Sequence, residues 1–179
     1  MYIWIGCALP QNFEDELRAH TRPLAQALAL DLEPFSLPQH ISLKISFDAG
    51  DRSEEILYAV ETLLRQETQF AVHPDSIVRQ GNILWITFQE NEILREIHNR
   101  LDSELQQQFG IGQHPFDRRF LFHSTVYIGE ENKIALAEEK LQSLCLPKSL
   151  HISRFLLGVS PSGKTGTYYV VREVSLENG

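Results

Sequence analysis

Apolar and polar residues alternate along the chain with two different periods, which together predict a mixed fold of strands and helices. Short apolar or alternating stretches predict β-strands over residues 2–9, 40–47, 69–73, 83–88, 121–128, 150–158 and 167–176. Apolar residues at helical spacing predict helices within residues 13–28, 56–64, 94–105 and 134–144. Turn residues at 81–82 and 161–164 predict two hairpins, so we expect an α+β fold with largely antiparallel sheets.

Five residues indicate where the predicted helices begin, end or bend. Asn91 is expected to cap the third helix and Gly110 to end it. Asp51 opens a sequence that resembles a capping box, and Asn132 is expected to cap the fourth helix. Pro23 is expected to kink or restart the first helix, because proline removes a backbone donor.

Two of the predicted strands carry the same short polar pattern, a histidine followed two positions later by a hydroxyl residue. Because residues two apart in a strand point to the same side, each histidine shares a face with its hydroxyl residue. A predicted helix follows each copy, which suggests an internal duplication with one motif in each half. The copies are His40-Ile41-Ser42-Leu43 and His123-Ser124-Thr125-Val126, and they begin 83 positions apart (123 − 40).

Paired histidines and hydroxyls suit phosphoester chemistry. Near neutral pH one imidazole can be neutral and take a proton from an attacking nucleophile, while the other is protonated and gives a proton to the leaving oxygen. A hydroxyl beside each ring can donate to a phosphoryl oxygen and hold the group in line. No His or Cys spacing matches a zinc site, so we expect neither a metal nor a cofactor.

A histidine two positions before a hydroxyl residue is by itself a weak motif. The chain has a third copy at His151, just before the predicted last hairpin, and we interpret this copy as incidental. For His40 and His123 the alternative is two unrelated strand histidines. The polar face that His40 shares with its neighbours favours a place at a site.

Other residues near the motifs are weaker candidates for substrate binding. Lys44 and Tyr127 continue the two polar faces by alternation, where Lys44 would steady phosphate charge and Tyr127 would line a nucleotide pocket. The alternatives are a solvated lysine and a half-buried tyrosine. Either Arg118 or Arg119 would reach the phosphate or the base, the alternative being a surface loop charge. Trp85 is expected in the core rather than as a platform for a base.

Charge restricts the partners that the protein can bind. Its 179 residues include 16 Lys and Arg against 24 Asp and Glu, a formal net charge of −8. Since contacts to many phosphates need a surplus of cations, duplex DNA and anionic membranes are poor partners, whereas a single phosphate can still bind. The chain has no basic leader and no apolar stretch of membrane-spanning length, so we expect a cytoplasmic protein. Cys7 and Cys145 are expected to be reduced thiols.

The sequence resembles the two-histidine phosphoesterases, in the group of 2′-5′ RNA ligases and cyclic phosphodiesterases. Besides the two motifs, the resemblance rests on Pro38 before the first and on Arg118 and Phe120 before the second. The closing Gly166-Thr167-Tyr168-Tyr169 is also similar to the last strand of that family. The sequence departs from the family at Phe122, where a proline is usual, and at Ser42, where threonine is commoner.

The resemblance implies a bilobal, pseudo-symmetric fold in which residues 1–179 form one domain. Each lobe would be an antiparallel sheet with helices outside, and the two motifs would meet in a central groove. The implied activity is metal-independent hydrolysis of a 2′,3′-cyclic phosphate or a 2′-5′ phosphodiester at an RNA end or on a small nucleotide. We expect His123 to be the base and His40 the acid, although the symmetry permits the reverse.

Three other functions stay open at this point. A ligase would use the same groups in the reverse direction to form a 2′-5′ linkage. A non-catalytic module would bind an RNA end or a nucleotide in the same groove. A metal-dependent hydrolase would lose its activity on chelation. The oligomeric state is not indicated by the sequence.

Overall fold

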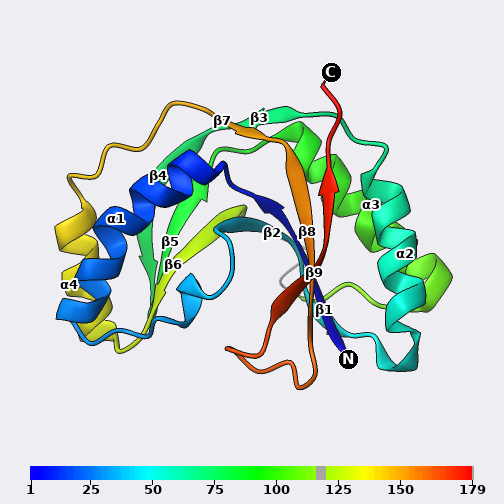
Figure 1. Cartoon of the computed structure of the whole chain (residues 1–179), viewed down its shortest axis with the longest axis horizontal. Helices are drawn as coiled ribbons and strands as arrows, with labels where there is room; N and C mark the ends of the chain where they lie inside the picture. The colour runs from blue at the N-terminus through cyan, green and yellow to red at the C-terminus, as the bar shows by residue number, and fades with distance from the viewer. Residues whose placement is uncertain (116–119, 179) are drawn as a thin grey trace.

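Two antiparallel sheets form the frame of the molecule, and a short two-stranded ladder lies between them (Figure 1). The computed structural model describes residues 1–115 and 120–178. The first sheet has the order β2-β1-β8-β9, with β1 (Tyr2–Ala8), β2 (His40–Asp48), β8 (Arg154–Ser160) and β9 (Tyr169–Ser175). The second has the order β4-β5-β6, with β4 (Pro74–Gln80), β5 (Ile83–Phe88) and β6 (His123–Ile128). The ladder pairs β3 (Phe70–Val72) with β7 (Leu150–Ile152).

Four α-helices in the described residues cover the outside of the sheets, two on each side (Figure 1). On one side lie α1 (Gln11–Ala27) and α4 (Glu131–Leu141), and on the other lie α2 (Ser53–Leu64) and α3 (Glu92–Phe109). None of these helices is long and apolar enough to cross a membrane. The arrangement confirms the α+β fold with antiparallel sheets.

The order of the elements repeats once along the chain. The first half runs β1-α1-β2-α2-β3-β4 and the second runs β5-α3-β6-α4-β7-β8, with β9 added at the end. The two motif strands, β2 and β6, take the same place, each at the end of its sheet and beside the first strand of its half. The topology therefore has the pseudo-symmetry that the family resemblance implies.

The first helix of each half contacts the motif strand of the other half. Helix α1 follows β1, but the Tyr127 hydroxyl of β6 donates to the carbonyl of Thr21 in α1 at 2.5 Å. Helix α3 follows β5, but His98 Nδ1 donates to the carbonyl of Leu43 in β2 at 2.6 Å. Since a helix from each half packs against the other half's motif strand, the two lobes are joined by more than their connecting loops.

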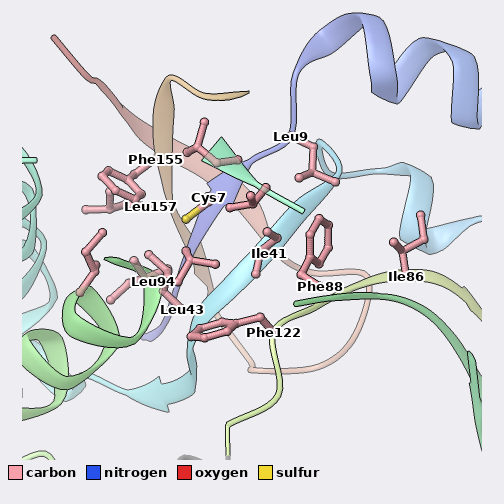
Figure 2. Close-up of a cluster of buried hydrophobic side chains, with 14 of the residues drawn as sticks. Cys7, Leu9, Ile41, Leu43, Ile86, Phe88, Leu94, Phe122, Phe155 and Leu157 are labelled. Atoms are coloured by element: carbon pink, nitrogen blue, oxygen red, sulfur yellow. The ribbon is translucent and has the colours of Figure 1, made fainter. Parts of the chain in front are cut away.

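One apolar core extends through both lobes (Figure 2). Figure 2 shows Ile41 and Leu43 of β2 close to Phe88 of β5 and to Phe122, which directly precedes β6. Cys7 lies in the same core, where burial raises the pKa of its thiol, and it is not paired with the exposed Cys145. Ile41, which lies between the histidine and the hydroxyl residue of the first motif, is therefore anchored in the core.

Each motif strand contains a β-bulge directly after its hydroxyl residue, in the same place in both halves. In a regular ladder, residues two apart on one strand lie opposite residues two apart on the neighbouring strand. Here they lie opposite consecutive residues, so the strand has one extra residue and its side-chain alternation is interrupted. The register places Ser42 and Lys44 opposite Gly6 and Ile5, and Thr125 and Tyr127 opposite Trp85 and Leu84.

A bulge precedes both Lys44 and Tyr127, and both residues are buried instead of lying on an exposed polar face. The Lys44 ammonium lies 2.6 Å from a carboxylate oxygen of Asp102 in α3, and the residue is 2% exposed. The alternative of a solvated lysine is therefore wrong, and a contact between Lys44 and a phosphate stays a prediction. Tyr127 is fully buried with its hydroxyl on the α1 backbone, so it does not line a nucleotide pocket, and burial raises its pKa.

The helix boundaries were predicted correctly where a cap is formed and wrongly where it is not. Asn91 accepts a bond from the backbone N–H three residues later at 3.0 Å, and Gly110 ends α3 with a φ of 69°. Asp51 lies in a 3-10 turn before α2, and Asn132 lies inside the first turn of α4. Helix α1 continues through Pro23. Strand β4 was not predicted as a separate strand, because its sequence is mostly polar.

Removing one partner of the Lys44–Asp102 pair is expected to destabilise the fold strongly. The remaining charge would stay buried without its counter-charge, a change that costs about 3–5 kcal/mol in comparable pairs. Urea unfolding of Lys44→Met and Asp102→Asn measures this cost. Glu55→Gln, which removes one charge of an exposed pair with Arg52, serves as the control and should change little. Unfolding of Lys44→Met at the wild-type urea concentration would show that the pair is unimportant.

Candidate active site

A cavity of about 650 Å³ lies between the two motif strands. His40 and Ser42 of β2 and His123 of β6 are in its wall, so the structure brings the two motifs to one place. The volume is typical of a site for a small molecule. The rest of the wall is largely apolar and is formed by Trp4, Leu37, Lys44, Ile45, Ser46, Gln80, Ile83, Trp85, Phe120, Leu121 and Tyr168.

The two hydroxyl residues differ in how they reach this cavity. Ser42 is part of the wall, as the strand alternation predicts. Thr125 is half-buried on the same face of β6 as His123 but is not part of the wall. Ser124 points to the core and is 1% exposed, which confirms the predicted orientation of its side chain.

Each histidine is oriented by the same local hydrogen bond. Nδ1 of His40 lies 2.7 Å from the carbonyl oxygen of Pro38, and Nδ1 of His123 lies 2.7 Å from that of Leu121. A carbonyl oxygen can only accept, so Nδ1 carries the proton in both rings. Nε2 is then the nitrogen that can exchange a proton with a substrate.

Each histidine ring also packs against a tryptophan from the neighbouring strand, tilted in the pair with Trp4 and stacked in the pair with Trp85. The ring centroids of His40 and Trp4 are 4.4 Å apart with planes inclined by 31°. Those of His123 and Trp85 are 4.0 Å apart with planes inclined by 29°. The prediction that Trp85 is simply a core residue is therefore wrong.

The positions of the two tryptophans in the sequence give a hint of their role that composition alone does not reveal. They are the only two in the chain and stand 81 positions apart (85 − 4), close to the spacing of 83 between the histidines. Two residues after Trp4 comes Gly6, and a glycine inside a strand often marks a close approach. The two tryptophans are therefore close to the motif spacing without holding equivalent positions, since Gly6 lies opposite Ser42 and Trp85 lies opposite Thr125.

Burial lowers the pKa of both imidazoles. Loss of water is the largest cause for each ring, and the Nδ1 bond to the backbone carbonyl partly opposes it. For His40 the nearby charge of His123 lowers the pKa further, so the two rings are coupled electrostatically. Burial therefore favours the neutral form of both rings in the free protein.

A buried glutamine links the two motifs directly. Gln39, which precedes His40, donates from Nε2 to the carbonyl of Thr125 at 2.9 Å. The Ser124 hydroxyl donates to Oε1 of the same glutamine at 3.0 Å. One side chain therefore ties the start of β2 to the residues that follow His123, a contact that no sequence pattern indicates.

Few charges face the cavity in the described part of the chain. Its wall includes no carboxylate, and the Lys44 ammonium is held by Asp102. Arg118 and Arg119 lie outside the described residues. Among the residues that the structure describes, no group of three or more His, Cys, Asp or Glu side chains could hold a metal ion. His151 lies exposed on β7 and is not part of the wall, consistent with an incidental motif.

A second nucleotide-binding pattern in the sequence has the wrong structural context. Residues 158–165 match the glycine and lysine spacing of a P-loop, which holds phosphate at the N-terminus of the helix that follows it. Here Gly158 lies inside β8, and the segment leads into strand β9 instead of a helix. The match is therefore not a nucleotide site.

Sequence and structure comparisons agree with this geometry. The model of the 2′-5′ RNA ligase superfamily matches residues 10–161. A search of curated proteins found no significant match.

Several solved structures have the same fold. LigT of E. coli in complex with 3′-AMP is 16% identical, with a TM-score of 0.59 and 98% of each chain covered. TT0787 of Thermus thermophilus is 16% identical, with a TM-score of 0.61 and 99% of each chain covered. Usb1 of Kluyveromyces marxianus is 11% identical, with a TM-score of 0.59 and 98% of each chain covered. At these identities the likeness shows the fold alone.

Both cavity histidines are expected to titrate below the ordinary histidine pKa of about 6.5. NMR titration of the ring resonances measures this, with His40→Gln and His123→Gln used for assignment. Removing His123 should raise the pKa of His40, because one opposing charge is lost. A His40 pKa that does not respond to His123→Gln would contradict the coupling.

The same shifts predict how stability depends on pH. In the unfolded chain these histidines bind protons near pH ~6.5, whereas in the native protein they do so only at lower pH. Their contribution to the free energy of unfolding is therefore complete above pH ~6.5 and is lost as the pH falls through the native pKa. Urea midpoints between pH 5 and 8 should show less of this loss in the two glutamine variants.

Proposed function

Because the chain belongs to the 2′-5′ RNA ligase superfamily of two-histidine phosphoesterases, we propose that it hydrolyses a 2′,3′-cyclic phosphate or a 2′-5′ phosphodiester. The substrate is a short RNA end or a small nucleotide. The observation that carries this proposal is the symmetrical pair of histidines in one cavity, each with Nδ1 bonded to a carbonyl and Nε2 left for the reaction.

The reaction needs one base and one acid. For a cyclic phosphate, Nε2 of His123 takes a proton from water as the water oxygen bonds to phosphorus. The bond from phosphorus to one ribose oxygen breaks, and Nε2 of His40 gives its proton to that oxygen. Proton exchange with solvent then restores both rings. The symmetry of the site also allows the two histidines to exchange roles.

Substrate binding is expected to make the acid take up a proton from solvent. Burial lowers the pKa of both rings in the free protein, but a bound phosphate is an anion beside them. A nearby negative charge favours the protonated form of an imidazole, so one ring gains a proton as the complex forms. Ser42 and Thr125 are the proposed donors to the non-bridging phosphoryl oxygens, and Ser42 is the one in the cavity wall.

The other functions are separated from hydrolysis by experiment. A ligase would use the same groups in reverse, but the abundance of water favours hydrolysis. A binding module would retain affinity for a cyclic nucleotide without turning it over. The solved structures of LigT include complexes with 3′-AMP and with ATP, which supports a nucleotide as the ligand of this cavity.

Replacing either cavity histidine by alanine is expected to reduce kcat/KM at least ~10²-fold, because each ring moves a proton in the reaction. The assay is hydrolysis of a 2′,3′-cyclic mononucleotide. His151→Ala, at an exposed histidine outside the cavity, is the matched control and should keep wild-type activity. A His123→Ala protein with near-normal turnover would refute the assignment.

The pH dependence of kcat/KM should be bell-shaped with its maximum below pH ~6.5. This parameter reports the free enzyme, where burial lowers the pKa of both rings. The maximum lies below pH ~6.5 because kcat/KM is highest where one ring is protonated and the other is neutral, which is the pH range between the two lowered pKa values. A maximum above pH 7 would show that neither ring acts as proposed.

Activity is expected to resist chelation and to depend weakly on salt and RNA length. One to three phosphate contacts at ~0.7 per contact give a shallow slope of log affinity against log salt for a single strand. The comparison is between a cyclic mononucleotide and a long RNA with a cyclic phosphate end, with and without chelator. Loss of activity with chelator, or a steep slope with strong preference for the long RNA, would contradict the proposed site.

A further inference from the structure

We propose that Trp4 and Trp85 are positioning residues, whose indole faces hold the two histidine rings in their reactive orientation and favour the protonated ring during turnover. The proposal rests on the proposed function for the role of the histidines. Its geometric basis is independent of that function, because one contact between a tryptophan ring and a histidine ring occurs in each half of the molecule.

The first sheet has a slot that fits the indole of Trp4. A Cβ atom at Gly6 would lie 2.9 Å from the Trp4 ring and 3.1 Å from the ring of His40. A Cβ atom at Gly158, on the other neighbouring strand, would overlap Nε1 of Trp4. Two glycines therefore let the indole lie flat across the sheet and reach His40, which a larger residue at either place would prevent.

The second sheet produces the same contact by a different route. Trp85 lies directly opposite Thr125 in the β5–β6 ladder, which places its side chain beside that of His123. No glycine is needed, because the indole comes from the strand position next to the motif. Two different local solutions that both bring a tryptophan ring against a histidine ring indicate that the contact itself matters.

Hydrogen bonding does not explain where these indoles lie. A buried tryptophan usually has a partner for its N–H. In the described residues, the buried Nε1 atoms of Trp4 and Trp85 have no hydrogen-bond partner. The tryptophans are therefore held by contacts of their ring faces, and the imidazole is one of the groups they contact.

The tryptophan contact completes the restraint on each imidazole. The bond from Nδ1 to a backbone carbonyl acts in the plane of the ring, whereas the indole contacts its face. The two contacts together oppose rotation about both side-chain bonds of the histidine. Nε2 then keeps its direction while the protonation state changes.

The indole face also stabilises the positive charge of a protonated imidazole. It carries a negative quadrupole and attracts a cation, which by typical energies favours protonation of the stacked ring by a factor of about 2 to 30. The other described titratable groups of the cavity wall are Lys44, whose ammonium is held by Asp102, and Tyr168. The tryptophans therefore oppose the effect of burial on each ring and the effect of His123 on His40.

The test replaces each tryptophan by leucine and by phenylalanine and measures both histidine pKa values by NMR, together with kcat and KM on a cyclic mononucleotide. Trp85→Leu should lower the pKa of His123 and reduce kcat about 10-fold while KM changes less. Trp85→Phe keeps a flat face and should recover most of the loss. Trp4→Leu and Trp4→Phe should act in the same way on His40.

The control is Ile83→Ala, which alters the same wall on the same strand as Trp85. It should leave the pKa of His123 unchanged, whatever it does to KM. If Trp85→Leu fails to fold, Trp85→Met takes its place, because it fills similar space without a ring. A His123 pKa that is equal in wild type, Trp85→Phe and the ring-free variant would overturn the proposal. Absence of turnover in the wild type would instead count against the proposed function alone, because the NMR readout needs no substrate.

Discussion

The pairing of each motif strand with its neighbour is the constraint on which the site depends. This pairing is regular through the histidine and the hydroxyl residue and is then interrupted by a bulge. Before the bulge, alternation sends the histidine to the cavity and its neighbour to the core. After the bulge, Lys44 and Tyr127 are buried, and each forms a polar contact with a helix. The cavity wall receives one histidine from each motif strand, further polar residues mainly from β2, and mostly apolar residues elsewhere.

The largely apolar cavity wall has two opposing effects on the histidines. An apolar wall excludes water and makes each charge more effective, but it also lowers the pKa of both rings. The proposed reaction needs one ring to be protonated. The carbonyl of Pro38 or Leu121, the face of a tryptophan and the anionic substrate all favour the protonated state. These contacts offset burial without bringing a permanent charge into the wall.

The relative position of the two lobes is fixed by several kinds of contact. The apolar core continues from one lobe into the other, and each half packs its first helix against the motif strand of its partner. Gln39 adds a hydrogen-bonded link from the first motif to the second. A site built from two strands of different sheets needs such links, because a small shift between the sheets would separate the two histidines that the proposed reaction brings to one phosphate.

The sequence by itself determined the α+β class, most of the strands and helices, and the two histidine motifs with their hydroxyl residues. These features are local: alternation, helical spacing and the caps at Asn91 and Gly110 depend on a few neighbouring residues. Only the tertiary structure decided the positions of Lys44, Tyr127, Trp4, Trp85 and Gln39. A bulge, a stacked ring or a bridging amide depends on which strand lies alongside and in which register. That choice is made by the packing of segments far apart in the chain, which no short stretch of sequence contains.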